Sequence, residues 1–224
     1  MSFFSSLTRT GFFIVLIAGC QFLSSCKFGP PRFSELTEEF VYTTLSFSPV
    51  TATAVGYHRH MGVPLDELMD DVSQPALDRQ REFYKKFQKI LEMTAVAKLT
   101  PEDKADYALI QNQLQLSLLE LETLQRYKHD PNLYIELIGQ ALFTPYTIEY
   151  AEKDLRFFHI VRRLESVPAL LHHARRHLTD SSEPALLMAR EGVRANVEMI
   201  DQILRPEVPE QLKAKYKDAA GQAI

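Results

Sequence analysis

The feature that most constrains this fold is the spacing of apolar residues, which recur every three or four positions over long segments. The run Thr100-Pro101-Glu102-Asp103 begins the clearest example. Thr suits a helix N-cap, Pro suits the first turn, and the two acids favour the positive end of the helix dipole. One face of the helix that follows is apolar, and it carries Tyr107, Ile110, Leu114, Leu118, Leu121 and Leu124.

Other segments have the same periodicity, and no alternating pattern typical of strands extends for any length. The chain has 224 residues with 46% apolar residues, only 8 Gly and 12 Pro, which favours helices separated by prolines over a turn-rich β protein. We predict helices in residues 75–99, 100–127, 154–167 and 182–204, a short helix in 131–143, a connector in 144–154 and a new start at Pro168. The fold class is therefore all-α, an irregular multi-helix bundle spanning residues 34–224.

Residues 1–26 have the organisation of an export signal, and 27–33 of a tether containing Pro30-Pro31. The apolar stretch "GFFIVLIA" is shorter than the ~20 residues that a membrane-spanning helix needs. Cys20 follows Ala18-Gly19 and fits a bacterial lipoprotein cleavage box; Cys26 is the alternative, and an ordinary cleaved signal peptide is a third reading. We expect export to the cell envelope or periplasm and a lipid anchor in the membrane. No cysteine follows Cys26, so neither a disulfide nor a cysteine metal site is expected in the mature chain.

The stretch "HHARRH", residues 172–177, has the histidine density of a metal site. His173 and His177 lie four residues apart, which puts both rings on one helix face. A zinc helix of the His-Glu-x-x-His type carries a Glu that Ala174 replaces here, and Arg175 and Arg176 would oppose a dication. We therefore interpret the stretch as a solvated basic helix face with one ring packed inward.

Other polar groups carry weaker signals. Asp66, Glu67, Asp70 and Asp71 lack the spacing of an EF-hand and are interpreted as a solvated acidic loop. In "GYHRH", Tyr57, His58 and His60 follow an expected helix end at Gly56 and are weak candidates for a site, with carbonyl capping as the structural alternative. Ser181 and Ser182 indicate a helix cap. The net charge of −4 with interspersed signs provides no basic stripe, so no nucleic-acid partner is expected.

Four stretches, taken in order, resemble the bacterial family named domain of unknown function 885. "SPVTATAVGYHRHMG" is similar to a Pro-x-x-Ala-Thr-x-x-Gly-x-His opening. "LTPEDKADYALIQNQLQLSLLELE" is similar to a Leu-(Thr/Ser)-Pro-Glu-Asp…Asp-Tyr-x-Leu…Asn-x-Leu run. "HDPNLYIELIG" resembles an (Asn/Asp)-Pro-x-x-Tyr pattern, and "RLESVPALLHHARRHL" resembles Arg-Leu-x-x-(Ile/Val)-Pro-x-x-Leu-x-x-Ala. The resemblance covers about residues 34–223.

This resemblance implies a largely helical, exported protein similar to zinc metallopeptidases. The family's metal motif, His-Glu-x-x-Pro-Gly-His, lies in a later half and has no copy here, so no catalytic or metal-binding residue and no cofactor are expected in this chain. Zinc is expected only in a full-length member. The chain is then the N-terminal part of a larger helical protein, a scaffold whose partners are the missing C-terminal half and a peptide substrate. A stand-alone helical lipoprotein that acts as a binding or interaction module is the alternative.

Overall fold

The computed structural model of the protein describes residues 32–224, and these form one compact unit. The predicted signal segment, both candidate lipidation sites Cys20 and Cys26, and most of the tether lie outside the described residues. Within residues 32–224, no helix is both long enough and apolar enough to cross a membrane.

The all-α prediction is confirmed, because helices dominate the described region and the two strands are two residues long each. The elements in chain order are α1 (Phe33–Phe47), α2 (Pro49–Ala54), β1 (Arg59–His60), β2 (Val63–Pro64), α3 (Gln74–Glu92), the 3-10 turn η1 (Val96–Lys98), α4 (Pro101–Leu118), the π-helical turn η2 (Leu119–Leu124), α5 (Arg126–His129), α6 (Asn132–Thr147), α7 (Lys153–His177), α8 (Glu183–Glu198), the π-helical turn η3 (Met199–Leu204), α9 (Arg205–Glu207), the 3-10 turn η4 (Glu210–Leu212) and α10 (Lys213–Ala223).

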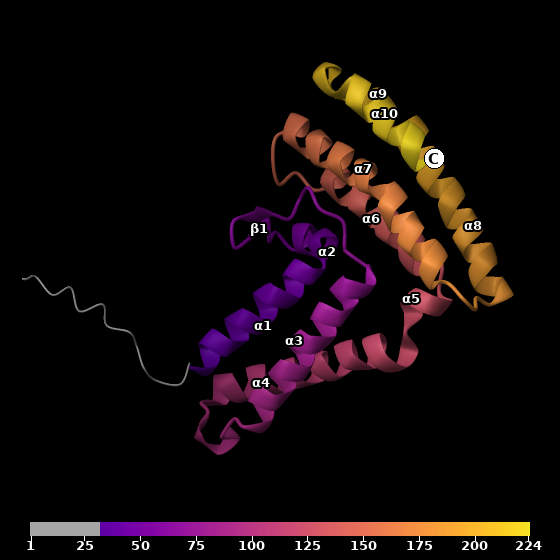
Figure 1. Ribbon diagram of the computed structural model, residues 1–224. Helices are drawn as coiled ribbons and strands as arrows, with labels where there is room; N and C mark the ends of the chain where they lie inside the picture. The colour runs from indigo at the N-terminus through magenta and orange to yellow at the C-terminus, as the bar shows by residue number, and fades with distance from the viewer. Residues whose placement is uncertain (1–31) are drawn as a thin grey trace, which may run out of the picture. The chain divides into compact units, whose positions relative to one another are not determined.

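Two groups of helices share one apolar core. In the first group, α3 and α4 pack together and α1 packs on α4; in the second, α6 lies against α7 and α8, and α10 runs along α7 (Figure 1). Short helix α2 packs on α6 and joins the two groups. Phe87, Leu114, Leu142, Ile160 and Leu164 are among the fully buried side chains of this core.

The predicted helix starts are confirmed by their capping bonds. The Thr100 hydroxyl accepts from the Asp103 backbone N–H at 3.1 Å, with Pro101 in the first turn. The Ser182 hydroxyl accepts from the backbone N–H of Ala185 at 3.4 Å. Each bond satisfies one of the donors that a helix leaves free at its N-terminus.

The helix predicted to run to residue 99 ends at Glu92, and a separate 3-10 turn follows at Val96–Lys98. Two further predicted boundaries are wrong because the structure places prolines inside helices. Helix α6 continues through Pro145 to Thr147, so residues 144–147 are not a connector, and α7 continues through Pro168 to His177. A proline inside a helix has no N–H for the carbonyl four residues earlier, which for Pro145 is that of Ala141. The Arg163 side chain supplies the replacement donor, since its Nη1 donates to Ala141 O at 2.9 Å.

Candidate functional site

The loop after α2 positions the histidine that sequence reasoning singled out. Gly56 and Gly62 have φ of +80° and +86°, a backbone region that glycine adopts without steric cost. Gly56 precedes the β1–β2 hairpin, and Gly62 lies in the turn between its two strands. The backbone N–H of Leu65 donates to the carbonyl of His58 at 2.9 Å. These constraints fold residues 55–66 back on themselves, so that His58 meets Asp66.

His58 and Asp66 form a hydrogen-bonded dyad. His58 Nδ1 lies 3.0 Å from Asp66 Oδ1, and the His58 side chain is 38% exposed whereas the Asp66 side chain is only 10% exposed. When Nδ1–H donates to the carboxylate, Nε2 is left as an acceptor. The same Asp66 oxygen accepts from the Thr53 hydroxyl at 2.8 Å. A histidine oriented in this way can accept a proton or a ligand at Nε2.

A fully buried arginine lies beneath the dyad. Arg163, on α7, is 0% exposed, and its Nη2 donates to the Thr53 hydroxyl at 2.6 Å. Burial lowers the pKa of Arg163, and the negative charges of Asp66 and Asp70 act in the opposite direction. A guanidinium remains charged in proteins, so these two carboxylates provide its compensating charge. Its Nε is buried without a hydrogen-bond partner among the described residues.

Three rings are layered beside this arginine. The His58 ring stacks on Tyr150 with centroids 4.9 Å apart, and Tyr150 stacks on the buried His159 at 5.9 Å. The Tyr150 hydroxyl also bonds His159 Nδ1 at 2.9 Å. Burial lowers the pKa of His159 and raises that of Tyr150, so both are uncharged at neutral pH. We call His58, Asp66, Thr53, Arg163, Tyr150 and His159 the polar network.

The interpretation of residues 66–71 as a solvated acidic loop is wrong for two of its four acids. Asp66 is buried in the polar network. Asp70 Oδ1 accepts from the Val50 backbone N–H at 3.0 Å, and burial raises the pKa of Asp70 to about 6. Glu67 and Asp71 remain near the surface, paired with Arg162 and Arg79 at 3.6 Å each. Asp66, which is buried, and Asp70, which is partly buried, compensate the charge of Arg163, a residue distant in sequence.

Tyr57 and His60, the other two weak candidates, contact each other. The Tyr57 hydroxyl lies 2.8 Å from His60 Nδ1, and the Tyr57 ring stacks on Tyr42 with centroids 4.9 Å apart. The recorded contacts of this pair stay on the α1 side of the hairpin, whereas His58 contacts Asp66 and Tyr150. The structure therefore brings only His58 of the three into the polar network.

Sequence reasoning missed Thr53, Tyr150, His159 and Arg163. One signal was available: Arg156, His159 and Arg163 follow one another at spacings of three and four, on the same helix face as Ile160 and Val167. Polar residues on an apolar face must find partners when the face is buried. Arg156 does so by donating to the carbonyls of Pro145, Tyr146 and Ala151 around the end of α6.

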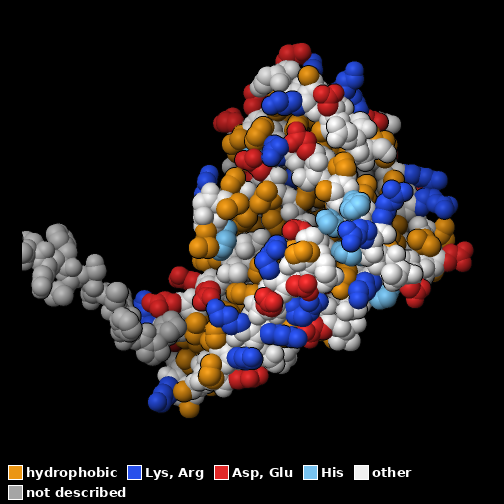
Figure 2. All heavy atoms as spheres, viewed as in Figure 1, with side chains coloured by type: hydrophobic (Ala, Val, Ile, Leu, Met, Phe, Trp, Pro, Cys, Tyr) orange, Lys and Arg blue, Asp and Glu red, His pale blue; other side chains and the backbone are white. Residues whose placement is uncertain are grey.

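The "HHARRH" stretch forms the last turns of α7, where histidines gather among Lys and Arg side chains (Figure 2). His172, Arg175 and Arg176 are exposed, and His177 is half-buried against Tyr127 and within 3.3 Å of the Tyr134 hydroxyl. Burial is the main cause of the lowered pKa of His177. This arrangement agrees with the basic helix face inferred from the sequence.

A zinc ion finds no fitting donor set in the described region. Across residues 32–224, no three His, Cys, Asp or Glu side chains converge in a way that could hold a metal ion. His173 and His177 stack with centroids 6.1 Å apart, and no acidic side chain joins them as a third ligand. No reaction step is therefore assigned here to a metal.

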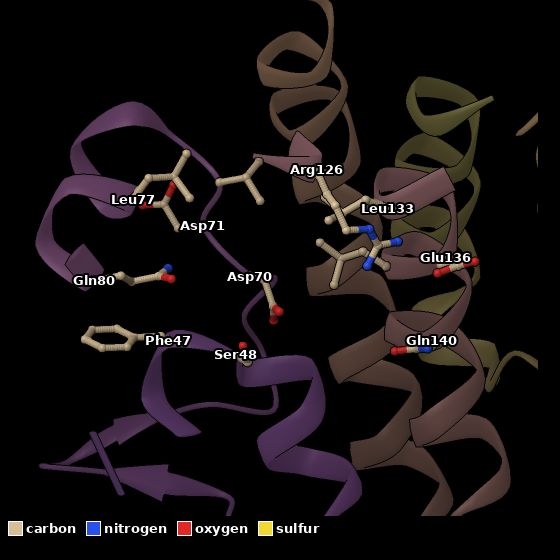
Figure 3. Close-up of a pocket in the computed structure, with 12 residues that line it drawn as sticks. Phe47, Ser48, Asp70, Asp71, Leu77, Gln80, Arg126, Leu133, Glu136 and Gln140 are labelled. Atoms are coloured by element: carbon tan, nitrogen blue, oxygen red, sulfur yellow. The ribbon is translucent and has the colours of Figure 1, made fainter. Parts of the chain in front are cut away.

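A pocket of about 260 Å³ lies next to the polar network, and Asp70 belongs to its wall. Figure 3 shows Asp70 between Ser48 and the α6 wall, with Arg126 beside Leu133 on the α6 side of the pocket. Asp71 from the loop before α3, Gln80 from α3, and Glu136 and Gln140 from α6 add polar groups. The apolar part of the wall consists of Phe47, Val72, Leu77, Leu133 and Leu137.

Comparison with known proteins identifies the family. The profile of the family described as "Bacterial protein of unknown function (DUF885)" matches residues 49–223, and the chain therefore belongs to this family. No curated protein matches the chain. Among solved structures, the chain is similar to "a putative lipoprotein of unknown function from Shewanella oneidensis", with a TM-score of 0.74 and 20% sequence identity. The match covers 86% of this chain and 35% of that one, so the chain spans about a third of the length of this structural relative.

Proposed function

We propose that this member of the DUF885 family is the N-terminal scaffold region of an exported, zinc-metallopeptidase-like protein, and that it is inactive alone. In such a protein, zinc would polarise a peptide carbonyl and activate water. Ligands for that zinc would come from a later region that carries the His-Glu-x-x-Pro-Gly-His motif. The role of residues 32–224 is to form a helical wall beside the substrate.

One observation carries the proposal: the same arrangement of helices makes up only about a third of the similar lipoprotein. The polar network adds support for a scaffold role. Arg163 joins α6, α7 and the end of α2 through Ala141 and Thr53, and Asp66 extends that connection to His58. A buried charge held by so many partners fixes the relative position of these elements. The dyad then holds the partly exposed ring of His58 on a rigid wall.

Two proteins measured side by side test this proposal. The first is residues 27–224 of this chain, and the second is a longer family protein that contains the same region and the metal motif. Zinc is measured by mass spectrometry of the metal, and activity by cleavage of a mixed peptide library. We expect stoichiometric zinc and cleavage only in the longer protein. Zinc-dependent cleavage by the short chain, or no zinc in either protein, would contradict the proposal.

The alternative function, a helical lipoprotein that acts as a binding module, is favoured by the pocket beside Asp70. A formed pocket with convergent polar groups is a common property of binding sites. In this alternative the chain would bind a ligand without any catalysis. The two functions are separated by the same peptide-cleavage measurement, made together with the binding assay described below.

For location, we propose export to the cell envelope and anchoring in the periplasm through a lipid on Cys20, with Cys26 as the alternative. The similar protein from Shewanella oneidensis, described as a lipoprotein, supports this proposal. Incorporation of labelled palmitate into the intact chain and into the Cys20→Ser and Cys26→Ser variants tests it. We expect label in the intact chain and in Cys26→Ser only. Equal label in both single variants would contradict the choice of Cys20.

A further inference from the structure

The pocket bordered by Asp70 has a carboxylate whose charge is incompletely compensated. Asp70 accepts from the Val50 backbone N–H at 3.0 Å and from the Ser48 hydroxyl, and both donors are neutral. Its compensating cation, Arg163, is shared with Asp66 and the polar network. Burial therefore outweighs these contacts and raises the pKa of Asp70 to about 6. A cation placed in the pocket would supply what the protein lacks here.

The other polar groups of the pocket have spare hydrogen-bonding capacity. Glu136 and Gln140 lie one helical turn apart on α6, and Gln80 faces them from α3 (Figure 3). No hydrogen bond or ion pair is recorded for these three side chains among residues 32–224. Arg126 uses Nε and Nη2 on Asp130, at 3.3 and 2.7 Å, which leaves Nη1 for an oxygen atom of a ligand.

Size and apolar lining restrict the ligand further. At about 260 Å³ the cavity is slightly below the ~300 Å³ at which pockets for drug-sized molecules begin, and it suits a group of the size of one amino-acid residue. Leu133 and Leu137 lie on the α6 wall, and Phe47 and Leu77 face them. The lining thus combines an apolar surface with three carboxylates, two side-chain amides and the guanidinium of Arg126.

We propose that this pocket binds an α-ammonium group together with its apolar side chain, as found in a free amino acid and in the N-terminal residue of a peptide. The ammonium lies at Asp70, with Glu136 as a further carboxylate on the α6 wall. The third carboxylate of the lining, Asp71, already accepts from the Ser73 backbone N–H and pairs with Arg79. The neighbouring carbonyl or carboxylate oxygen accepts from Arg126 Nη1 or from the amide of Gln140. The apolar side chain packs between Leu133, Leu137 and Phe47. This inference does not depend on the metallopeptidase assignment, because it uses no metal and no residue outside 32–224.

The test is calorimetric titration of the full chain, in the presence of EDTA, with four probes that share one side chain. L-leucinamide carries the ammonium and a neutral carbonyl, L-leucine carries the ammonium and a carboxylate, and the tripeptide Leu-Gly-Gly presents a peptide N-terminus. N-acetyl-L-leucinamide lacks the ammonium. We expect saturable binding of at least one ammonium probe, and at least tenfold weaker binding of the acetylated probe. Equal binding of the acetylated probe, or no binding of any probe, would overturn the inference.

The pattern among the ammonium probes identifies the source of the ligand. Binding of L-leucine without the other two indicates a free amino acid, and binding of Leu-Gly-Gly and L-leucinamide indicates a peptide N-terminus. Both outcomes support the shared chemistry. Because EDTA is present throughout, failure of the zinc-peptidase proposal would leave these results unchanged.

Matched variants locate the binding site. Asp70→Asn keeps an acceptor for the Val50 N–H but removes the charge, and we expect at least tenfold weaker binding of the ammonium probes. Glu136→Gln lies on an exposed helix face, so it keeps the fold even if Asp70→Asn does not, and a severalfold loss is expected. Glu92→Gln, at the end of α3 and outside the pocket, should bind as the unchanged chain does. Unchanged affinity in both pocket variants would place the ligand elsewhere and overturn the inference.

Discussion

The two ends of helix α7 carry similar residue types and behave in opposite ways. Near its start, Arg156, His159 and Arg163 are buried, and each has specific hydrogen-bond partners. At its end, the arginines of "HHARRH" are exposed, and only His177 turns a ring toward the core. The dense cluster of histidines is thus the solvated end, whereas the dispersed polar residues form the ordered network.

This difference shows that burial on a shared helix face, rather than the local density of histidines and arginines, determines whether these side chains form an ordered network. A buried charge or imidazole must be compensated, because a polar group without partners loses its solvation energy. The compensating groups come from segments far away in the sequence, such as Thr53, which is 110 positions from Arg163. Exposed histidines and arginines are solvated by water and impose no such requirement. Variants at the two ends can therefore break or sharpen this contrast.

The largest effect is expected for Arg163→Met. This change keeps much of the side-chain volume but leaves Asp66 and Asp70 without their cation and Ala141 O without its donor. Breaking a buried pair by removing one partner typically costs ~3–5 kcal/mol. We expect a loss of this order in the free energy of unfolding, measured by urea denaturation at pH 7.5. The matched change Arg176→Met, at the exposed end, should stay within ~0.5 kcal/mol. Similar losses in both variants would remove the contrast between the ends.

A pH-dependent effect of somewhat smaller size is expected at Asp70, the carboxylate that faces Arg163. Its pKa of about 6 in the folded state exceeds the ordinary value of 3.8, so the folded state binds this proton more tightly than the unfolded state. The contribution of Asp70 to stability is therefore fully present below about pH 4 and is lost as the pH rises through about 6. One pKa unit corresponds to ~1.4 kcal/mol, and the full change is on the order of 3 kcal/mol.

Asp70→Asn removes this titration. We expect the unchanged chain to gain stability relative to Asp70→Asn as the pH falls from 7.5 to 4.5, with the difference followed by urea denaturation at each pH. The titrations of His159 and His177 are common to both chains and cancel in the difference. Glu92→Gln, the same kind of change at an exposed site, serves as the control. If the stability difference between the unchanged chain and Asp70→Asn stayed constant across this range, burial would not govern the pKa of Asp70.

Much of the fold was predictable from sequence, because helix starts depend on neighbouring residues. Thr100-Pro101 and Ser182 contain their own capping groups, and the structure confirms both. The interior prolines were not predictable in this way. Pro145 lies inside α6 because Arg163, eighteen positions later, donates to the carbonyl that the proline leaves free. A local rule that ends a helix near a proline cannot include a donor from another helix.

The candidate site was predictable only in part, for the same physical reason. The sequence makes His58 a weak candidate because it follows a helix end, but it predicts a solvated loop for Asp66. The two side chains are neighbours only in the folded structure. Asp66 is buried because Thr53, His58 and Arg163 provide hydrogen bonds and compensating charge. The stretches that resemble the family contain Thr53, His58 and Arg163. The structure adds the physical link, a hydrogen bond of 2.6 Å between the Arg163 Nη2 and the Thr53 hydroxyl.

A moderate effect is expected for His159→Phe, which removes the partner of the Tyr150 hydroxyl while keeping an aromatic ring. Loss of one hydrogen bond to a partly buried group costs about 1 kcal/mol. Because burial lowers the pKa of His159, the folded state resists its protonation, and this contribution to stability is lost as the pH falls below about 6.5. The deficit of the variant in unfolding free energy, relative to the unchanged chain, should therefore be smaller at pH 5 than at pH 7.5. Tyr150→Phe, which removes the hydroxyl but keeps His159, should retain the pH dependence; a difference independent of pH would contradict the buried state of His159.

The smallest effects are expected at the end of α7, and they decide whether "HHARRH" has any role in metal binding. His173→Ala removes a ring that stacks on His177 but has no recorded hydrogen bond, so the unfolding free energy should change by less than ~0.5 kcal/mol. His177→Ala also removes contacts with Tyr127 and Tyr134, so a slightly larger loss of about 1 kcal/mol is expected. Titration of residues 27–224 with zinc should give the same affinity for both variants and the unchanged chain, because no third ligand completes a site around these rings in the described region. A tenfold or greater fall in zinc affinity on His173→Ala would reverse the comparison, making the exposed end of α7 a functional site rather than a solvated helix end.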